Sequence, residues 1–346
     1  MKRGESGLSL VVGVRKPQGM TSHDVVGYVR RIFGEKRVGH AGTLDPLATG
    51  VLAVCIGSAT RLSEYLTSHD KNYTARIVFG YATDTDDAEG VLTDEAPVPT
   101  DLTDPVFAER YVAKLVGTSK QLPPLYSAIK VNGRKACDEA RKGHVIHIEP
   151  RDIEVYEARL VNMETVEEEL RTPEGERMIR TVAWDVAFRV SKGTYIRSLA
   201  RDMGNELGCY AHLGALERTV AGELTLDNCC TLEALEAVRE RAALDPVRLL
   251  GKRFAYVRDE LLARVKNGGA LAPQELELFE YFGDGSRRDV CACTTDMVES
   301  PQPPAHGELI SLIGNNRLVA LYRFDANANR LKPDKVFQGG VSRGCA

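Results

Sequence analysis

The stretch that decides the fold of this chain is GHAGTLDPLATG at residues 39–50, followed directly by the apolar run VLAVCI at residues 51–56. The apolar run predicts a buried strand. The segment before it is interpreted as a loop with three glycines, a residue that lets backbone approach a ligand closely. Pro46 fixes its own φ and favours an extended conformation at Asp45. We therefore expect a loop that presents the Asp45 carboxylate rigidly where a strand begins.

The segments around this loop predict interleaved strands and helices. Thr21 or Ser22 can cap a helix that runs to about Phe33 and ends at Gly34. Charged residues 164–180 indicate an exposed hairpin or loop. Further strands are expected at residues 8–14, 73–79 and 182–190, and further helices at residues 59–67 and 196–208. Because no regular βαβ rhythm joins them, we predict an α+β fold with a mixed, mainly antiparallel central sheet flanked by helices.

The chain of 346 residues is long enough for two domains. The pattern changes near residues 245–252 and then becomes rich in short strands and breaks. We expect a larger domain at residues 1–250 and a small β-rich domain at residues 251–346.

Charge is spread unevenly along the chain. The net charge is −4, but residues 1–80 carry 11 basic and 6 acidic residues, and residues 120–151 carry 7 and 3. A solvated surface explains each basic stretch equally well, so these stretches alone do not identify a polyanionic partner.

The 8 cysteines include no CxxC pair, and their spacing does not favour a zinc site. The amino-terminal apolar run ends at Arg15 and Lys16. It is too short for a membrane span and lacks a signal-cleavage region. A cytoplasmic protein with reduced thiols and no membrane attachment is the expectation.

The loop at residues 39–50 closely resembles the signature loop of the TruB family of tRNA pseudouridine synthases. Four further segments match the family in the same order: KPQGMTSHDVV (16–26), KNYTARIVFGYATDTDDAEG (71–90), PPLYSAIKVNGRKACDEARKG (123–143) and SKGTYIRSLARDMGNELG (191–208). A weaker match is AHLGALERTVAGEL at residues 211–224. The resemblance implies the pseudouridine synthase fold, with a PUA-like domain at the carboxyl-terminal end.

The resemblance also implies roles for individual residues. Asp45 corresponds to the catalytic aspartate, Tyr73 to the tyrosine that stacks on the target base and assists proton transfer, and Arg197 to the arginine that pairs with the catalytic carboxylate. The implied substrate-binding residues are His40, Tyr73, Asp87, Tyr195 and Leu216. Without this context, Asp45 would be an ordinary turn residue and Tyr73 a core residue of its strand.

In the resembling family, the segment that corresponds to residues 120–151 closes over the tRNA arm. The phosphate contacts that we expect from it are Lys130, Arg134, Lys135, Arg141 and Lys142. The sequence departs from the family pattern at Val190, where cysteine is common, and at Glu217, where a basic residue is usual.

The function implied is conversion of uridine-55 in the TΨC arm of tRNA to pseudouridine. This isomerisation involves no redox change, and the chain has no P-loop, Rossmann or zinc pattern, so we expect no cofactor and no metal. A monomer without an obligatory protein partner is the default. Three alternatives remain: a guide-RNA-dependent synthase acting on ribosomal RNA, a tRNA-folding chaperone with incidental catalysis, and a retaining glycosidase with a second carboxylate.

Overall fold

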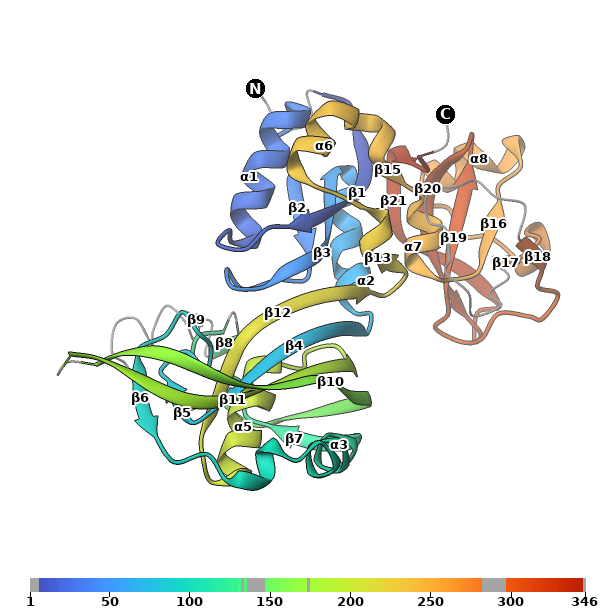
Figure 1. Ribbon diagram of the computed structural model, residues 1–346. Helices are drawn as coiled ribbons and strands as arrows, with labels where there is room; N and C mark the ends of the chain where they lie inside the picture. Colours follow the sequence, from blue (N-terminus) through green and yellow to red (C-terminus); the bar gives the residue numbers. More distant parts are fainter. Residues whose placement is uncertain are drawn as a thin grey trace. The chain divides into compact units, whose positions relative to one another are not determined.

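The computed structural model describes residues 6–127, 129–131, 134–135, 147–172, 175–281 and 297–344 (Figure 1). The chain forms two compact units. The first contains Met1–Pro46, Gly50–His69 and Val220–Ala346, and the second contains Leu47–Thr49 and Asp70–Thr219. The first unit is thus assembled from three separate stretches of chain, whereas the second is almost one continuous stretch.

The amino-terminal part of the first unit is centred on strand β1 (Ser9–Lys16). β1 pairs antiparallel with β3 (Thr49–Gly57) and β15 (Ala243–Leu244), and parallel with β14 (Cys229–Cys230). The expected strand at 51–56 is confirmed within β3, where all six side chains are buried. Continuous burial explains why this strand is apolar along its whole length rather than alternating.

Helix α1 (Ser22–Phe33) covers one face of these strands (Figure 1). It begins with a capping box, in which the Thr21 hydroxyl accepts a hydrogen bond from the Asp24 backbone N–H at 3.1 Å and the Asp24 carboxylate accepts from Thr21 N–H at 2.9 Å. It ends at Gly34, whose φ of 62° lies in the left-handed region that favours glycine. The helix predicted from the sequence is confirmed at both ends.

One part of the sequence interpretation was wrong. Residues 39–41 were assigned to a loop, but they lie in strand β2 (Val38–Ala41), which pairs antiparallel with β3. Gly39 lies opposite Cys55, and His40 lies opposite Val54. Glycine is weak in strands by itself, so the pairing with a fully buried neighbour, rather than local propensity, decides this conformation.

The carboxyl-terminal residues of the first unit form a six-stranded sheet, as expected of a β-rich region. Its order is β18-β17-β16-β19-β20-β21. The strands are β16 (Phe254–Tyr256), β17 (Phe279–Tyr281), β18 (Met297–Glu299), β19 (Leu309–Gly314), β20 (Arg317–Asp325) and β21 (Arg330–Ser342). Phe254, Leu321 and Phe337 belong to the same buried cluster as Val11 and Cys55, so this sheet shares a core with β1 and β3. The division into domains at residues 250 and 251 stays a prediction.

The first unit has one more short strand, β13 (Leu224–Thr225), and several short helices. They are η1 (Ser58–Leu62), α2 (Ser63–Thr67), η3 (Leu226–Asn228), α6 (Leu232–Val238), η4 (Arg239–Ala242), α7 (Pro246–Leu250), α8 (Asp259–Lys266) and η5 (Pro273–Glu275).

A buried ion pair joins α7 to the residue that follows β21. Asp245 is 0% exposed, and both of its carboxylate oxygens accept hydrogen bonds from the Arg343 Nε at 3.1 Å. The Tyr281 hydroxyl donates to the same carboxylate at 3.2 Å, and Val247 N–H donates to it at 2.9 Å as the first turn of α7 begins. A carboxylate removed from water needs this set of donors, because a buried charge without partners is strongly destabilising.

The second unit is built on strands in the order β12-β4-β11-β10-β7. The pairs β4–β11, β11–β10 and β10–β7 are antiparallel. The strands are β4 (Lys71–Phe79), β7 (Gly117–Gln121), β10 (Arg151–Thr172), β11 (Gly175–Val190) and β12 (Ala211–Ala221). The helices are η2 (Thr100–Thr103), α3 (Pro105–Ala113) and α5 (Ile196–Leu207), and two short hairpins pair β5 (Tyr81–Thr83) with β6 (Leu92–Glu95) and β8 (Lys130–Val131) with β9 (Arg134–Lys135).

Trp184 marks the core of the second unit. Its side chain on β11 is 0% exposed, and its indole N–H donates to the Leu102 carbonyl at 3.0 Å. Its ring meets Phe79 edge-on at 4.7 Å between centroids and Tyr111 at 6.0 Å. The strand and the two helical segments η2 and α3 are therefore held together by one aromatic side chain with a satisfied polar atom.

The charged stretch at 164–180 is confirmed as a hairpin, formed by the distal parts of β10 and β11 (Figure 1). β11 also pairs with β4 through residues 182–190, whereas the pairs from Val166–Thr181 to Thr172–Gly175 involve only the two hairpin strands. Among the side chains that the structure describes in this stretch, Glu164, Glu167, Arg177 and Arg180 are exposed, as expected of charged residues.

The predicted fold class is confirmed: the protein is mixed α+β, with mainly antiparallel sheets flanked by helices and a β-rich sheet at the carboxyl-terminal end. None of the helices in the described part of the chain has the length and apolar character needed to cross a bilayer.

Candidate active site

Asp45 lies half-buried in the loop between β2 and β3 of the first unit. On its amino-terminal side, Leu44 is bound through its backbone to the buried hydroxyl of Ser22, the first residue of α1. The Leu44 N–H donates to the Ser22 Oγ at 2.8 Å, and this hydroxyl donates to the Leu44 carbonyl at 3.1 Å. Ser22 therefore satisfies both the N–H and the carbonyl of Leu44, the residue before Asp45.

The carboxyl-terminal side of Asp45 is fixed as firmly. The Pro46 carbonyl accepts hydrogen bonds from the Gly19 backbone N–H at 2.9 Å and from the Lys16 Nζ at 3.3 Å. Lys16 is 0% exposed, and its ammonium also donates to the carbonyls of Pro17 and Met20. Residues 16–22 thus hold the backbone on both sides of Asp45.

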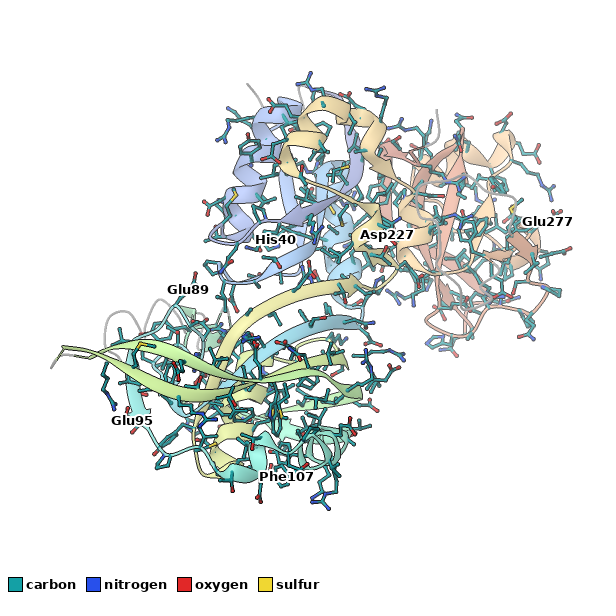
Figure 2. The ribbon with its side chains drawn as sticks, viewed as in Figure 1. His40, Glu89, Glu95, Phe107, Asp227 and Glu277 are labelled. Carbon is teal, nitrogen blue, oxygen red and sulfur yellow. The ribbon has the colours of Figure 1, made fainter. Side chains whose placement is uncertain are left out.

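Two glycines with positive φ lie close to Asp45, Gly42 in the loop and Gly50 at the start of β3. Gly42 and Gly50 have φ angles of 94° and 98°, which other residues rarely adopt. His40 lies just before this loop, half-buried on β2 (Figure 2). Of the three glycines that were expected in this loop, Gly42 lies between the strands, whereas Gly39 lies in β2 and Gly50 lies in β3.

Tyr73, Lys71 and Leu216 lie on neighbouring strands of the second unit. Tyr73 and Lys71 share a face of β4 and are 9% and 7% exposed. Burial, and secondarily the charge of Arg218 on β12, lower the pKa of Lys71 to about 8. Leu216 lies two residues before Arg218, and its carbonyl accepts from the Thr49 hydroxyl at 3.3 Å. The structure thus places a buried aromatic ring and two buried cations in this part of the unit.

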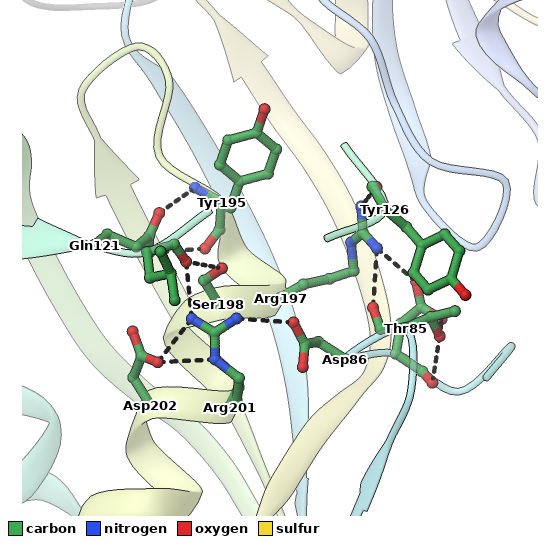
Figure 3. Close-up of polar contacts among 11 residues, drawn as sticks. Thr85, Asp86, Gln121, Tyr126, Tyr195, Arg197, Ser198, Arg201 and Asp202 are labelled. Atoms are coloured by element: carbon green, nitrogen blue, oxygen red, sulfur yellow. Dashed lines mark hydrogen bonds and ion pairs between the residues drawn. The ribbon is translucent and has the colours of Figure 1, made fainter. Parts of the chain in front are cut away.

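Arg197 lies in the first turn of α5 and is 5% exposed (Figure 3). Its Nη1 donates to the Thr85 carbonyl at 2.9 Å, and its Nη2 donates to the Tyr126 carbonyl at 3.0 Å. The Asp87 carboxylate lies 3.6 Å from Nη1 and also accepts from the Thr85 hydroxyl at 2.6 Å. A cation at the start of a helix is disfavoured by the helix dipole, and these acceptors compensate by stabilising the Arg197 guanidinium.

A second arginine follows one turn later on α5. The Arg201 Nη1 donates to the Asp86 carboxylate at 3.0 Å, and its Nη2 donates to the Leu122 carbonyl at 2.8 Å (Figure 3). Burial raises the pKa of the Asp86 carboxyl, and the charges of Arg201 and Arg197 partly oppose this. The Ser198 hydroxyl donates to the same Leu122 carbonyl at 2.9 Å. Two arginines thus join the start of α5 to the two segments that contain Asp86 and Leu122.

Gln121, at the end of β7, binds the residue immediately before α5. Its amide Nε2 donates to the Tyr195 carbonyl at 3.0 Å, and its Oε1 accepts from the Tyr195 N–H at 2.9 Å. Neither Gln121 nor Arg201 was predicted from the sequence as a site residue. The four-residue spacing of Arg197 and Arg201 was a usable signal for Arg201, because it places both on one helix face. A lone glutamine in a strand gave no such signal.

The predicted phosphate contacts are only partly within the described residues. The backbones of Lys130, Arg134 and Lys135 lie in the β8–β9 hairpin, where Lys130 pairs with Lys135. Arg141 and Lys142 lie outside the described residues. These five assignments stay predictions.

Asp84, Asp86 and Asp87, and the histidines at 144 and 147, are of the residue types that can bind metal ions. In the described ranges no group of three or more His, Cys, Asp or Glu side chains is arranged to hold a metal ion. Asp84 accepts from the Val91 N–H at 2.7 Å, and His147 pairs with Glu149 at 2.9 Å; His144 lies outside those ranges.

Solved structures share this fold. The chain in "Crystal Structure of a Cbf5-Nop10-Gar1 Complex" superposes with a TM-score of 0.63 at 23% identity, covering 98% of this chain and 86% of that one. The chain in "Structure of H/ACA RNP bound to a substrate RNA containing 2'-deoxyuridine" gives 0.59 at 21% identity, covering 97% and 88%. At these identities the similarity shows the fold alone.

Sequence comparisons define the class of protein as a pseudouridylate synthase, which is an isomerase. The model "TruB family pseudouridylate synthase (N terminal domain)" matches residues 30–196, and "tRNA pseudouridylate synthase B C-terminal domain" matches residues 197–251. The tRNA pseudouridine synthase B of Bacillus subtilis is 38% identical, covering 83% of this chain and 89% of that protein. That of Thermobifida fusca is 45% identical, covering 76% and 86%. The chain belongs to the TruB family.

Proposed function

We propose that this enzyme isomerises uridine-55 in the TΨC arm of tRNA to pseudouridine, with Asp45 as the nucleophile and without a cofactor. Membership of the TruB family supports the reaction, as do the relatives named tRNA pseudouridine synthase B at 38% and 45% identity. The observation that carries the assignment of Asp45 is the loop geometry. Its backbone is bound on both sides by residues 16–22, which leaves the carboxylate on a support that does not need to reorganise during catalysis.

The reaction suits a carboxylate. It breaks the glycosidic C–N bond of uridine and forms a C–C bond between the same sugar carbon and C5 of the base. C5 loses its proton and the freed ring nitrogen gains one, so the composition is unchanged. A nucleophilic carboxylate must be ionised at neutral pH, and in this proposal Arg197 is the cation that favours its ionised form. Tyr73 stacks on the target base and assists proton transfer at C5.

The remaining proposed roles concern substrate binding. Tyr195 and Leu216 line the base-binding region, and His40 displaces the target base from its stack, since an enzyme acting on a stacked base must extrude it. Asp87 is engaged by Thr85 and lies 3.6 Å from Arg197, so its proposed role is to hold the arginine in place.

tRNA is the proposed partner, and no protein partner is part of the proposal. We propose phosphate contacts for Lys130, Arg134, Lys135, Arg141 and Lys142. Each neutralised phosphate releases counterions, so the affinity for tRNA is expected to fall steeply between about 50 and 200 mM salt. A binding curve that stays flat over this range contradicts these contacts. The bacterial relatives, named as tRNA-modifying enzymes, support a cytoplasmic location.

The test is pseudouridine mapping on unmodified tRNA, incubated in the presence of a metal chelator with the wild type, with Asp45→Asn and with Asp94→Asn. Asp94 is an exposed carboxylate on β6 and serves as the matched control. We expect conversion at one uridine of the TΨC arm by the wild type and the control, and its loss in Asp45→Asn with tRNA binding retained.

Two results would overturn this assignment. Binding without conversion by the wild type would favour a tRNA-folding chaperone. Full activity of Asp45→Asn would show that Asp45 is not the nucleophile, although the proposed reaction would still stand.

A further inference from the structure

Gln121 is a buried polar residue that the catalytic proposal does not use. It ends β7, which lies at the edge of its sheet, and its side chain is 2% exposed. Both polar atoms of its amide bind one residue, Tyr195, at 2.9 and 3.0 Å (Figure 3). The amide therefore acts as a backbone strand would, by donating to a carbonyl and accepting from an N–H of the same residue.

The location of this contact gives it a consequence for the site. Tyr195 is the residue immediately before α5, and no side chain caps the helix at this position. Arg197 follows two residues later, and its guanidinium reaches the carbonyls of Thr85 and Tyr126. A shift of the Tyr195 backbone would therefore move both the Tyr195 ring and the Arg197 side chain.

We propose that Gln121 is a positioning residue for isomerisation: its amide fixes the backbone at Tyr195, and through it the Tyr195 ring and the Arg197 guanidinium. This inference rests on the proposed function, in which Tyr195 binds substrate and Arg197 assists the nucleophile. Gln121 itself makes no contact with substrate in this mechanism.

Other contacts hold β7 in place, so the Gln121 amide is not needed to keep this strand folded. β7 is also held by its ladder with β10, where Gln121 pairs with Arg151 and Gly117 with Val155. The next residue, Leu122, is bound through its carbonyl by Ser198 and Arg201. Loss of the amide would leave these contacts in place, so its effect should concentrate at Tyr195.

The experiment compares Gln121→Leu and Gln121→Glu with the wild type, in single-turnover conversion of a TΨC stem-loop transcript at saturating enzyme. Ser119→Ala is the matched control, since Ser119 lies two residues earlier on the same strand and is exposed. A misplacement of catalytic groups by about 1 Å costs on the order of 100-fold in rate. We expect a loss of about this size in Gln121→Leu, with the dissociation constant of the transcript and the melting temperature changed little, and no loss in the control.

Gln121→Glu provides a rescue that a packing role would not show. A protonated glutamic acid keeps one donor and one acceptor in the shape of the amide, whereas the carboxylate has no donor and would face the Tyr195 carbonyl. Burial raises a carboxyl pKa, so the rate of this variant relative to the wild type should rise as pH falls from about 8 to 5.5. Gln121→Leu should show no such recovery.

Other charged groups lie near position 121, and their titration affects the conversion rate of the wild type and of the variants alike. Lys120 pairs with Asp152 at 3.2 Å, and Arg201 pairs with Asp86 and with Asp202. Arg151 is the strand partner of position 121, and Glu206 on α5 accepts from Tyr111. Expressing each rate relative to the wild type at the same pH removes their titration from the comparison.

Hydrogen exchange supplies a readout that does not depend on activity. We expect faster exchange of the amides at residues 195–199 in Gln121→Leu, with unchanged exchange in β10. Two results would overturn the positioning role. One is a wild-type conversion rate in both variants. The other is a rate loss that accompanies a lowered melting temperature, with a ratio of the Gln121→Glu rate to the wild-type rate that does not change with pH. An inactive wild type would refute the proposed function instead, and the exchange result would still decide whether Gln121 fixes Tyr195.

Discussion

Lys71 allows the electrostatics of the second unit to be tested by a single substitution. Its side chain is 7% exposed on the same strand face as Tyr73, and burial together with the charge of Arg218 lowers its pKa to about 8. Lys71→Met keeps an unbranched side chain of similar length and removes the titrating amine. The expected effect is therefore a change in how stability depends on pH.

The size and sign follow from linkage. An unfolded lysine has a pKa of about 10.4, so the difference of roughly 2.4 units from the folded state corresponds to roughly 3 kcal/mol. Because the folded-state pKa is depressed, the unfolded protein binds more protons between about pH 8 and pH 10.4, and this residue makes stability rise with pH across that window. Below the window the wild type carries the full cost of a buried charge.

We expect the free energy of unfolding of Lys71→Met, relative to the wild type, to fall by roughly 3 kcal/mol between about pH 7.5 and 10.5. The assay is urea unfolding of both proteins across this range, followed by the fluorescence of Trp184, the only tryptophan, which lies in the second unit. Burial raises the pKa of Cys209 to about 11, and this and other titrations cancel in the difference. A difference that is constant across this pH range would refute the reasoning.

Three further predictions concern the fold and the Asp45 loop. Arg343→Met leaves the Asp245 carboxylate buried without its cation, and we expect urea unfolding to show a loss of about 3–5 kcal/mol that the added Asp245→Asn partly restores; a loss below about 1 kcal/mol contradicts this. Gly204→Ala would place a Cβ 2.1 Å from the Ala211 nitrogen, so we expect a loss of about 1–3 kcal/mol despite the helix preference of alanine, and a raised melting temperature would show the opposite. Ser22→Ala deprives Leu44 of its side-chain partner, and we expect a lower kcat for pseudouridine formation without a matching rise in KM; an unchanged kcat would mean that Ser22 does not position Asp45.

Much of the fold could be predicted from the sequence, where local signals agree with tertiary burial. The capping box at Thr21 and the stop at Gly34 define α1 directly, and the continuous apolar run defines β3. β2 could not be predicted, because glycine and histidine carry no strand signal and only pairing with β3 fixes them. The 164–180 hairpin is rich in charged residues and offers little hydrophobic pattern, so its length and conformation depend on cross-strand pairing.

The candidate site divides in the same way. Asp45, Tyr73 and Arg197 lie in motifs that can be recognised, and their roles stay predictions until they are tested. The contacts that hold them could not be predicted, because they are long-range hydrogen bonds between side chains and backbone. Ser22 binds Leu44 from 22 residues away, and Gln121 binds Tyr195 from 74 residues away. Sequence identifies groups that carry chemistry more readily than the groups that orient them.

The assembly of the first unit from three stretches has a consequence during protein synthesis. β1 and β3 leave the ribosome early. Yet β15, which pairs with β1, lies about 230 residues after it, and Arg343 of the Asp245–Arg343 pair lies almost 290 residues after the end of β3. At roughly 5–20 residues per second, the apolar faces of β1 and β3 wait on the order of tens of seconds for completion. The second unit, nearly continuous from Asp70 to Thr219, is synthesised in full within that interval. Nascent chains of this protein should therefore acquire protease resistance in the middle of the sequence before its beginning.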